Sequence, residues 1–347
     1  SNNLNLLEPC GQFGTRLMGG KDASQTRYIF TRLTPEARNV FDPRDDAILT
    51  YLDDDGRSIE PEFYMPTLPM ILVNGSEGIG TGFSCYVPPF NPKDIRNNIL
   101  NFLDGNPIKR MKPWFRGFKG KVFEQDDSWM TQGVWTVIGR TVKVTELPPG
   151  RWTQDYKEYL DTLIEKKKIT NYVNNSTTDD VNFSIEGYTG NDIIKDFKLQ
   201  KTFHVSNMHL FHPTKGIHKY ESPEEILTDF VKIRSETYKK RKAHLIRVLK
   251  EKSKKLENMS KFIDMVIHEK LIVFRRKRVE LEREMEKIFD KIDGSYEYLL
   301  NIKTYQYTLE AIQSIREETT KSRIELDTLQ QMSHIDMWKR DLKIYKQ

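Results

Sequence analysis

Arg27 and Tyr28 are neighbouring residues whose side chains together have the minimum equipment for covalent attack on a phosphodiester. A tyrosine hydroxyl has a pKa of about 10 in water, so it is a useful nucleophile only beside a cation or metal that favours the phenolate. An adjacent arginine also stabilises the charge that develops on a phosphoryl group in the transition state. A tyrosine on a helix more often has a packing role, and spacing alone leaves that alternative open.

Cations and glycines surround this pair. The segment 16–32 contains four cationic residues, namely Arg16, Lys21, Arg27 and Arg32. Such side chains contact DNA phosphates, and neighbouring glycines let the backbone approach closely. The whole chain has 347 residues, with 55 Lys and Arg against 50 Asp and Glu and a formal charge of +5. The strongly basic character is therefore local, and the segment is a candidate DNA contact.

A glycine-rich run at 75–82 is a second candidate site. It matches neither nucleotide-binding pattern, because no Gly-Lys-Ser/Thr ends it and its glycine spacing differs from the dinucleotide fingerprint. Following Asn74, the run predicts a tight loop or a hairpin tip. If that tip presents Ile79, the side chain could alternatively act as a wedge between DNA bases.

Metal-ligand patterns are weak in this sequence. The histidines between 204 and 218 are irregularly spaced for zinc. The two cysteines, Cys10 and Cys85, exclude a disulfide scaffold and a four-cysteine zinc site within the chain. Acidic runs at 45–46, 53–55 and 126–127 are by default solvated loops, with magnesium binding as the less favoured alternative.

The first 220 residues predict a mixed α+β arrangement. One helix is expected near 24–33, capped by Asp22 or Ser24 and ended by Thr34-Pro35, and the apolar run 70–73 is expected to be a strand. Helical spacing covers 95–103 and 152–168. The segments 134–138 and 141–145 alternate like an antiparallel strand pair around Gly139-Arg140.

A long helix is predicted from Ser222-Pro223 onward, where a cap candidate, an early proline and two acids open about 50 residues without Gly or Pro. One heptad register spans 245–266 and a second spans 312–329, with an Arg/Glu-rich helix near 276–291 and the turn Asp293-Gly294 between them. This order predicts an antiparallel coiled-coil hairpin with a small helical tip. The basic segment 239–242 is either a solvated helix face or a DNA contact.

No apolar stretch approaches the roughly 18–20 residues of a membrane span. The chain has no initiator Met and opens inside a predicted loop, so we expect a fragment of a longer protein.

Three motifs in the N-terminal part carry a family resemblance: Gly11-Gln12-Phe13-Gly14-Thr15-Arg16, Gly19-Gly20-Lys21-Asp22-Ala23 and Arg27-Tyr28-Ile29. They resemble the active-site region of eukaryotic-type (type IIA) DNA topoisomerase II. Further matches follow in the same order at 69–75, 77–82, 113–117, 145–148, 296–300 and 336–342. The resemblance covers essentially the whole chain, as the C-terminal part of the family's DNA breakage-reunion core.

The resemblance assigns roles to individual residues. Tyr28 would be the nucleophile that forms a transient 5′-phosphotyrosyl double-strand break, through which a second duplex is passed, and Arg27 its transition-state partner. Arg16 and Lys21 match positions that face the DNA backbone. Ile79 matches the residue that intercalates and helps to bend the DNA.

The resemblance also implies a mixed α+β fold in four parts. They are the C-terminal part of a winged-helix domain (1–62), an α/β tower domain (63–221), a long antiparallel coiled coil (222–275 and 305–347) and a helical C-gate dimerisation tip (276–304). The implied partners are double-stranded DNA, a second copy of the chain bound through the C-gate and the DNA gate, and upstream toprim and ATPase domains of the same polypeptide.

Those upstream domains would bind Mg²⁺ and ATP, so no cofactor-binding or metal-binding residue is expected in this chain. Alone, it is expected to be inactive in strand passage and to cleave DNA poorly or not at all. The stretch between 275 and 296 looks shorter than in cellular enzymes, which suggests a large DNA virus. The expected location is the nucleus for a cellular enzyme, and the host cytoplasm (viral factory) or nucleus for a viral one.

One alternative belongs to another functional class. A non-enzymatic coiled-coil protein that binds DNA or organises chromosomes would explain the helical hairpin and the basic segment 239–242. It would leave the surroundings of Tyr28 unexplained.

Overall fold

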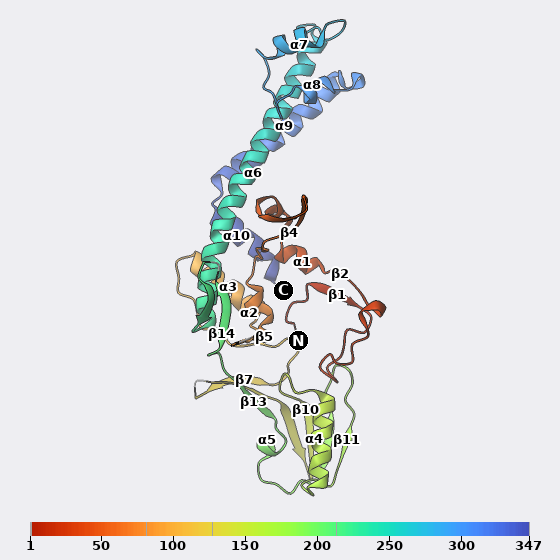
Figure 1. Ribbon diagram of the computed structural model, residues 1–347, viewed down its shortest axis with the longest axis vertical. Helices are drawn as coiled ribbons and strands as arrows, with labels where there is room; N and C mark the ends of the chain where they lie inside the picture. The colour runs from red at the N-terminus through yellow and green to blue at the C-terminus, as the bar shows by residue number, and fades with distance from the viewer. Residues whose placement is uncertain (1, 81, 127, 213, 347) are drawn as a thin grey trace. The chain divides into compact units, whose positions relative to one another are not determined.

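The computed structural model describes residues 2–80, 82–126, 128–212 and 214–346 (Figure 1). Thr81 of the glycine-rich run and Asp127 of one acidic run lie outside the described residues. The chain forms two compact units. The first comprises Ser1–Pro43, Phe63–Arg234 and Lys339–Gln347, and the second comprises Arg44–Glu62 and Ser235–Trp338.

A small antiparallel pair opens the first unit: β1 (Leu7–Cys10) and β2 (Phe30–Leu33), with the 3-10 helix η1 (Thr26–Tyr28) before β2. The prediction of a helix near 24–33, ended by Thr34-Pro35, is therefore wrong. Thr34 instead starts α1 (Pro35–Val40), because its side chain accepts a hydrogen bond from the Ala37 amide. A proline in the first helical turn costs no hydrogen bond, so Thr-Pro is a start signal here.

The run 70–73 is also helical rather than extended. It forms α2 (Met70–Asn74), and a short apolar run has no periodicity that separates a strand from a buried helix turn. Gly75, at φ 70°, ends this helix against the backbone of Val87. The glycine-rich run then forms the predicted hairpin from β5 (Ser76–Gly80) and β6 (Phe83–Val87).

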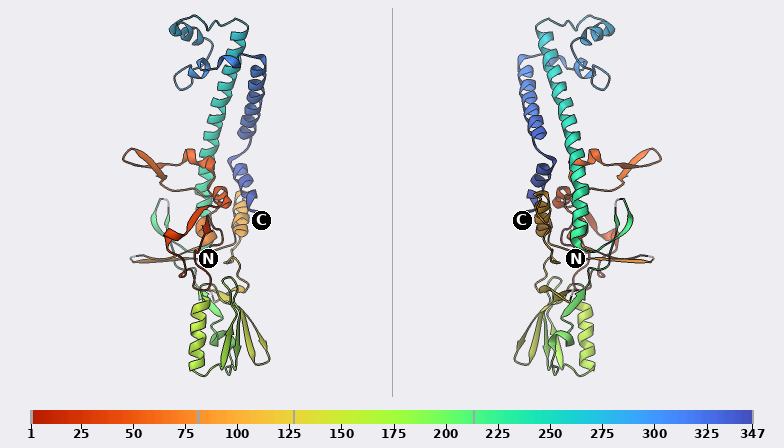
Figure 2. Two further views of the ribbon diagram at one scale, coloured as in Figure 1. Left: turned by 90° about the vertical axis from the view of Figure 1, so that its right-hand side faces the viewer. Right: turned by 90° about the vertical axis from the view of Figure 1, so that its left-hand side faces the viewer.

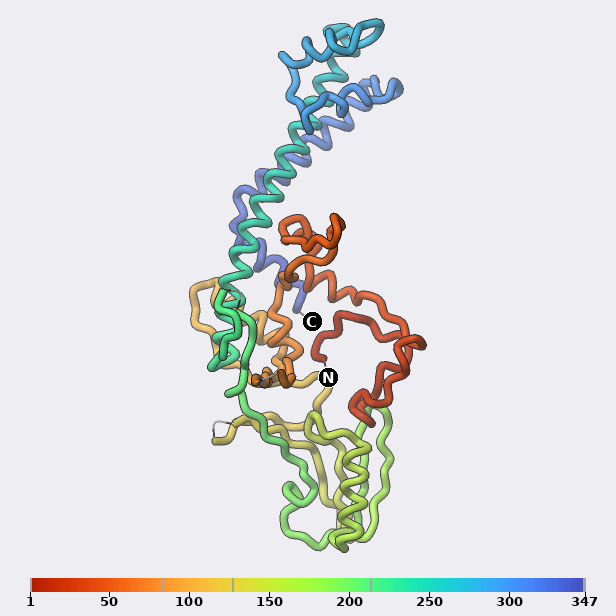
Figure 3. Tube along the Cα trace, in the orientation of Figure 1, coloured from red at the N-terminus to blue at the C-terminus, as the bar shows by residue number. Residues whose placement is uncertain are grey.

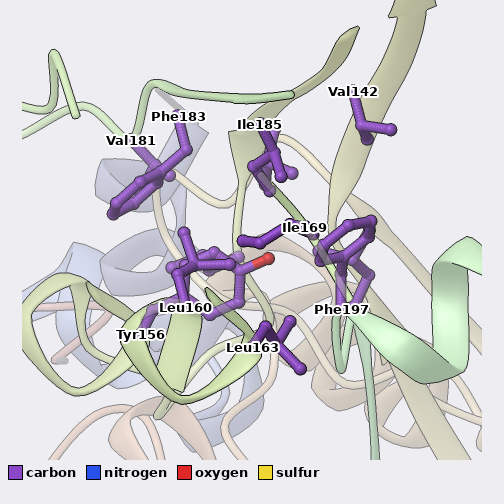
Figure 4. Packing of buried hydrophobic residues seen from close by; sticks show 12 residues of the cluster. Val142, Tyr156, Leu160, Leu163, Ile169, Val181, Phe183, Ile185 and Phe197 are labelled. Carbon is purple, nitrogen blue, oxygen red and sulfur yellow. The ribbon is translucent and has the colours of Figure 1, made fainter. Parts of the chain in front are cut away.

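One core of the first unit lies between a four-stranded antiparallel sheet in the order β11-β12-β10-β9 and helix α4 (Thr153–Glu165). Its strands are β9 (Val134–Ile138), β10 (Thr141–Glu146), β11 (Asn171–Asn174) and β12 (Phe183–Glu186). Alternate residues of β10 and β12 meet Tyr156 and Leu160 of α4 (Figure 4). The predicted strand pair and helix are confirmed here.

The first unit also has elements outside this layer. It contains α3 (Pro92–Leu103), α5 (Ile193–Asp196), a three-stranded sheet in the order β13-β8-β7 and a second hairpin. The strands of that sheet are β7 (Lys121–Gln125), β8 (Ser128–Gln132) and β13 (Gln200–Phe203), and those of the hairpin are β14 (Met208–His212) and β15 (Gly216–Tyr220). The short helix η4 (Leu342–Lys346) lies near the C-terminus.

Helix α6 (Pro223–Ile267) begins in the first unit, with the Ser222 hydroxyl accepting from the Glu225 amide as the sequence predicts, and continues into the second. There it lies beside α9 (Leu309–Gln331), as both views of Figure 2 show. Three contacts join the pair, and the residue numbers rise along α6 as they fall along α9: Lys242 to Gln330, Ser253 to Ser322 and Asp264 to Arg316. The two helices are therefore antiparallel.

The trace in Figure 3 shows the chain turning back between these helices, through α7 (Arg278–Met285), α8 (Glu297–Leu300) and η3 (Thr304–Gln306). Phe262, Met285 and Leu299 are among the buried residues that hold this region together. The second unit also contains the hairpin β3 (Tyr51–Asp54) and β4 (Arg57–Pro61). The helices η2 (Pro43–Ile48) and α10 (His334–Asp341) contribute to both units. No helix in the described part of the chain is long and apolar enough to cross a membrane.

Leu160 tests the core of the first unit. Because it is fully buried between α4 and the sheet, Leu160→Ala leaves a cavity and is expected to lower the free energy of unfolding by about 2–5 kcal/mol in urea denaturation. Leu33→Ala makes the same chemical change at an exposed position of the same unit and should shift it by less than about 0.5 kcal/mol. Equal effects of the two substitutions would contradict this packing.

Candidate nucleic-acid interface

Tyr28 is presented to solvent rather than packed. It ends η1, its amide donates to the Gln25 carbonyl over 2.9 Å, and its side chain is 67% exposed. The Arg27 guanidinium carbon lies 5.7 Å from the centre of the Tyr28 ring. Among the described residues, none makes a hydrogen bond to the Tyr28 hydroxyl. The packing role that the sequence left open does not fit this exposure.

The segment 11–24, here called the anchored loop, is closed by its own hydrogen bonds. The Thr15 amide and hydroxyl both donate to the Asp22 carboxylate, over 2.9 and 2.5 Å. The Ser24 amide donates to the Gln12 carbonyl over 2.9 Å. At Gly14 a Cβ atom would lie 2.4 Å from the backbone of the same loop, so the chain crosses itself where only glycine fits. These contacts give the residues before η1 a defined course.

Glu146 fixes the anchored loop to the sheet. Its carboxylate, 1% exposed at the end of β10, forms an ion pair with the Arg16 guanidinium, which donates to it through two nitrogens. The backbone amides of Lys119 and Leu147 also donate to it, over 3.1 and 2.9 Å. A carboxylate removed from water is stable only when such donors surround it, so the loop and the strand end hold each other.

Two further contacts fix the loop to the start of α4. The Gln154 amide donates to the Leu17 carbonyl over 2.9 Å. Gly19, at φ 62°, lies so close to Trp152 that a Cβ atom would meet the indole at 2.3 Å. The loop, the segment 115–118 and the corner 148–152 line a hollow of about 740 Å³. One end of the sheet-and-helix layer therefore determines where the loop lies.

Two of the four cations near Tyr28 in the sequence form ion pairs within the protein. Arg16 is engaged by Glu146, and Arg32 forms an ion pair with Glu8 on the neighbouring strand. Lys21 and Arg27 are exposed and form no ion pair among the described residues. The local positive charge available for an anionic ligand is therefore smaller than the sequence suggests.

Ile79 stands on a separate hairpin. It lies near the end of β5 and is 93% exposed, between Gly78 and Gly80, which carry no side chains. The hairpin is tied down from β6, where the Tyr86 amide donates to the Asn207 carbonyl over 2.8 Å. This aliphatic side chain is therefore available for contact with a large ligand.

The basic segment 239–242 is largely occupied within the second unit. Lys239 pairs with a glutamate one turn earlier, and Lys242 donates to a carbonyl of α9. Arg241 is buried, with its guanidinium 3.3 Å from Asp45 and stacked over the Tyr238 ring. Lys240 is exposed and forms no ion pair with another described residue. Three of the four cations thus have partners within the protein, which favours a structural role over a DNA contact.

The acidic and glycine-rich runs that the sequence raised as cofactor sites have structural roles among the described residues. No group of three or more His, Cys, Asp or Glu side chains among them is placed to hold a metal ion. Asp45 belongs to the buried pair with Arg241, and Asp53 accepts from the Gly56 amide at a hairpin turn. The glycine-rich run forms hairpin strands instead of a phosphate-binding loop before a helix.

Two residues with a visible signal were missed by the sequence reasoning. Glu146 occupies the same face of its strand as the buried Val142 and Val144, and an acid in that phase signals a buried partner. Phe211 falls in the outward phase of β14, between the less exposed Leu210 and His212. An aromatic residue in that phase signals an exposed contact.

The comparisons with known proteins agree with this architecture. The family model that describes the A subunits of DNA gyrase and topoisomerase IV matches residues 1–343. This chain belongs to the type II DNA topoisomerase family. DNA topoisomerase 2 of Penicillium chrysogenum is 37% identical over 99% of this chain and 24% of its own length. DNA topoisomerase 2, mitochondrial, of Dictyostelium discoideum is 38% identical over 100% of this chain and 28% of its own length. The chain thus spans about a quarter of these curated relatives.

A solved structure extends the comparison to the fold. The crystal structure of the Plasmodium falciparum topoisomerase II DNA-binding, cleavage and re-ligation domain matches with a TM-score of 0.89 and 36% identity. The match covers 99% of this chain and 52% of that one. The mixed α/β fold is therefore that of a topoisomerase II cleavage and re-ligation domain, and a non-enzymatic coiled-coil protein is not favoured.

Glu146→Gln tests the anchored loop. Removing the charge weakens hydrogen bonds to a charged group, each worth about 1.5–3 kcal/mol, so exchange of the Gln154 amide proton is expected to speed up on the order of tenfold. Hydrogen-exchange mass spectrometry or NMR measures this directly. Glu8→Gln, which removes an equivalent charge from the exposed pair with Arg32, should leave that amide unchanged. Unchanged exchange in Glu146→Gln would refute the anchor.

Asp22 gives a pH test of the same loop. Hydrogen bonds from the Thr15 hydroxyl and then from the Thr15 amide hold the pKa of Asp22 below its usual 3.8. Because the folded pKa is lowered, this contribution to stability is complete at neutral pH and is lost as pH falls through the folded pKa. Thr15→Val removes the hydroxyl alone, so an NMR titration should show the Asp22 midpoint rising part of the way back. An unmoved midpoint would contradict the contact.

Proposed function

We propose that this chain is the DNA-cleavage, religation and C-gate portion of an ATP-dependent type II DNA topoisomerase, an isomerase of DNA. The observation that carries the proposal is the exposed Tyr28 beside Arg27, shortly after a loop that the buried Glu146 carboxylate anchors through Arg16. Membership of the topoisomerase family supports it.

The proposed reaction is an exchange of phosphodiester bonds. The Tyr28 oxygen attacks a backbone phosphorus, the bond from phosphorus to the 3′ oxygen breaks, and that oxygen takes up a proton as the phenol loses one. The product is a 5′-phosphotyrosyl link and a free 3′ hydroxyl. Because the phosphotyrosine keeps the energy of the broken bond, the 3′ hydroxyl can reseal the strand. Arg27 stabilises the charge on the phosphoryl group during both steps.

DNA contacts follow from exposure and charge. Arg27 is an exposed cation beside Tyr28, and Lys21 is an exposed cation of the anchored loop, so we assign both to the DNA backbone. Arg16 keeps 27% of its side chain exposed while it pairs with Glu146, and we propose that it contacts phosphate from this fixed position. Ile79 would intercalate and bend the duplex, as exposed aliphatic wedges do.

The proposed domain assignment follows the family order. Residues 1–62 would complete a winged-helix domain, 63–221 form the tower, 222–275 and 305–347 the coiled coil, and 276–304 the C-gate tip. The antiparallel contacts of α6 with α9 support the coiled coil. Ile272, Phe274 and Val279 are large exposed apolar side chains at or beside the tip, which suits a homodimer contact there. A second dimer contact would lie at the DNA gate, where each copy cuts one strand.

Cofactors and further partners are assigned outside this chain. Upstream toprim and ATPase domains of the same polypeptide would bind Mg²⁺ and ATP. A nuclear location follows if the protein is cellular, and the host cytoplasm or nucleus if a large DNA virus encodes it.

Tyr28→Phe in the full-length protein is the test of function. It removes only the nucleophilic oxygen from an exposed side chain, so covalent DNA adducts should be lost completely while DNA binding stays within about twofold of the unchanged protein. Trapped adducts are measured by denaturing precipitation of labelled DNA, and binding by fluorescence anisotropy.

Tyr305→Phe is the matched control. Tyr305 is 71% exposed and lies near a cation, with the Lys303 ammonium 5.9 Å from its ring, much as Arg27 lies near Tyr28. It should keep full adduct formation and relaxation. Adducts that persist in Tyr28→Phe, or that vanish in Tyr305→Phe alone, would overturn the assignment of the nucleophile.

A further inference from the structure

The hairpin β14–β15 exposes an aromatic side chain that the proposed mechanism does not use. Phe211 is 83% exposed, and its partner across the hairpin is Ile217, which is also exposed. Side chains paired across two antiparallel strands lie on the same face. The hairpin therefore carries an apolar face in solvent, which in a folded protein marks an interaction site.

This hairpin lies beside the one that bears Ile79. The Asn207 carbonyl accepts from the Tyr86 amide, and the Asn207 side chain donates to the Ser84 hydroxyl over 2.6 Å, so β6 and the start of β14 are joined. Both hairpins project to the same side in the two views of Figure 2. Ile79, Phe211 and Ile217 line one shared hollow of about 410 Å³. Ile79 and Phe211 therefore belong to one surface.

The chemistry of this surface fits a DNA duplex. No Asp or Glu is among the described residues that line the hollow. Gly78 has open space where a Cβ would stand, which lets a DNA backbone come close. Lys215, at the turn of the β14–β15 hairpin, is an exposed cation. Phenylalanine is one of the residues that proteins insert between base steps from the minor groove.

We propose that Phe211 is a second apolar DNA contact, placed beside Ile79 so that the two side chains engage neighbouring positions of one bent duplex. The shared hollow receives the sugar and base edges between them. This proposal rests on the proposed function, because it takes the ligand of the Ile79 hairpin to be double-stranded DNA. It adds a residue and a surface to that site.

The test uses the full-length enzyme, an end-labelled duplex whose bending is read by fluorescence resonance energy transfer, and four variants. They are Ile79→Ala, Phe211→Ala, Phe211→Trp and the control Ile138→Ala, which truncates an exposed isoleucine on β9 of the same unit. Loss of one aromatic contact to DNA is expected to weaken formation of the bent complex on the order of tenfold in Phe211→Ala. Phe211→Trp should restore bending, with its emission quenched when the duplex is added.

The outcomes separate this proposal from the function on which it rests. If Ile79→Ala loses bending while Phe211→Ala matches Ile138→Ala, the Phe211 contact is overturned and the wedge at Ile79 survives. If neither variant loses bending, both are overturned, and retained Tyr28 adducts would still support the enzyme. The contact is also overturned if the added tryptophan emission of Phe211→Trp stays the same when the duplex is added. Circular dichroism of Phe211→Ala should be unchanged, because the side chain is exposed.

Discussion

Glu146, the last residue of β10, holds a buried carboxylate that water does not reach. Its donors are the backbone amides of Lys119 and Leu147 and the Arg16 guanidinium of the anchored loop. Releasing the loop would leave the carboxylate short of its strongest partner, so a segment rich in glycine keeps one position. Gly19 against Trp152 and Leu17 on the Gln154 amide complete the attachment. The roles proposed for Arg27 and Tyr28 depend on that fixed loop, because catalysis by positioning needs a defined approach to the phosphate.

Regular elements with a repeated period could be predicted from the sequence. The strands around Gly139-Arg140 and helices α4 and α6 carry alternation or helical spacing over enough residues to exclude the other choice. The errors fall on short segments. Thr34-Pro35 is compatible with either end of a helix, and only the pairing of β2 with β1 decides it. The run 70–73 is too short for periodicity, so the surrounding contacts determine its helix.

The sequence could nominate the residues of the candidate site, whose roles stay predictions, but it could not show which of their charges are paired. Tyr28, Arg27 and Ile79 are exposed, as residues for contact with a large ligand should be. Net charge along the chain could not show that Arg16 and Arg32 each pair with a carboxylate more than twenty residues away, since both pairs form only when the chain folds. Phe211 lacks any motif at all. Its proposed role depends on the β5–β6 hairpin, which is distant in sequence and adjacent in the fold.

The central claim is that Tyr28 itself becomes bonded to DNA. The most direct measurement traps the full-length protein on a DNA duplex, digests the DNA and the protein, and locates the remaining nucleotide by peptide mass spectrometry. We expect a nucleotide joined through its 5′ phosphate to the peptide that contains Arg27 and Tyr28, with fragment ions placing it on the tyrosine oxygen. A nucleotide on any other residue, or a trapped complex with no covalent link, would contradict the claim.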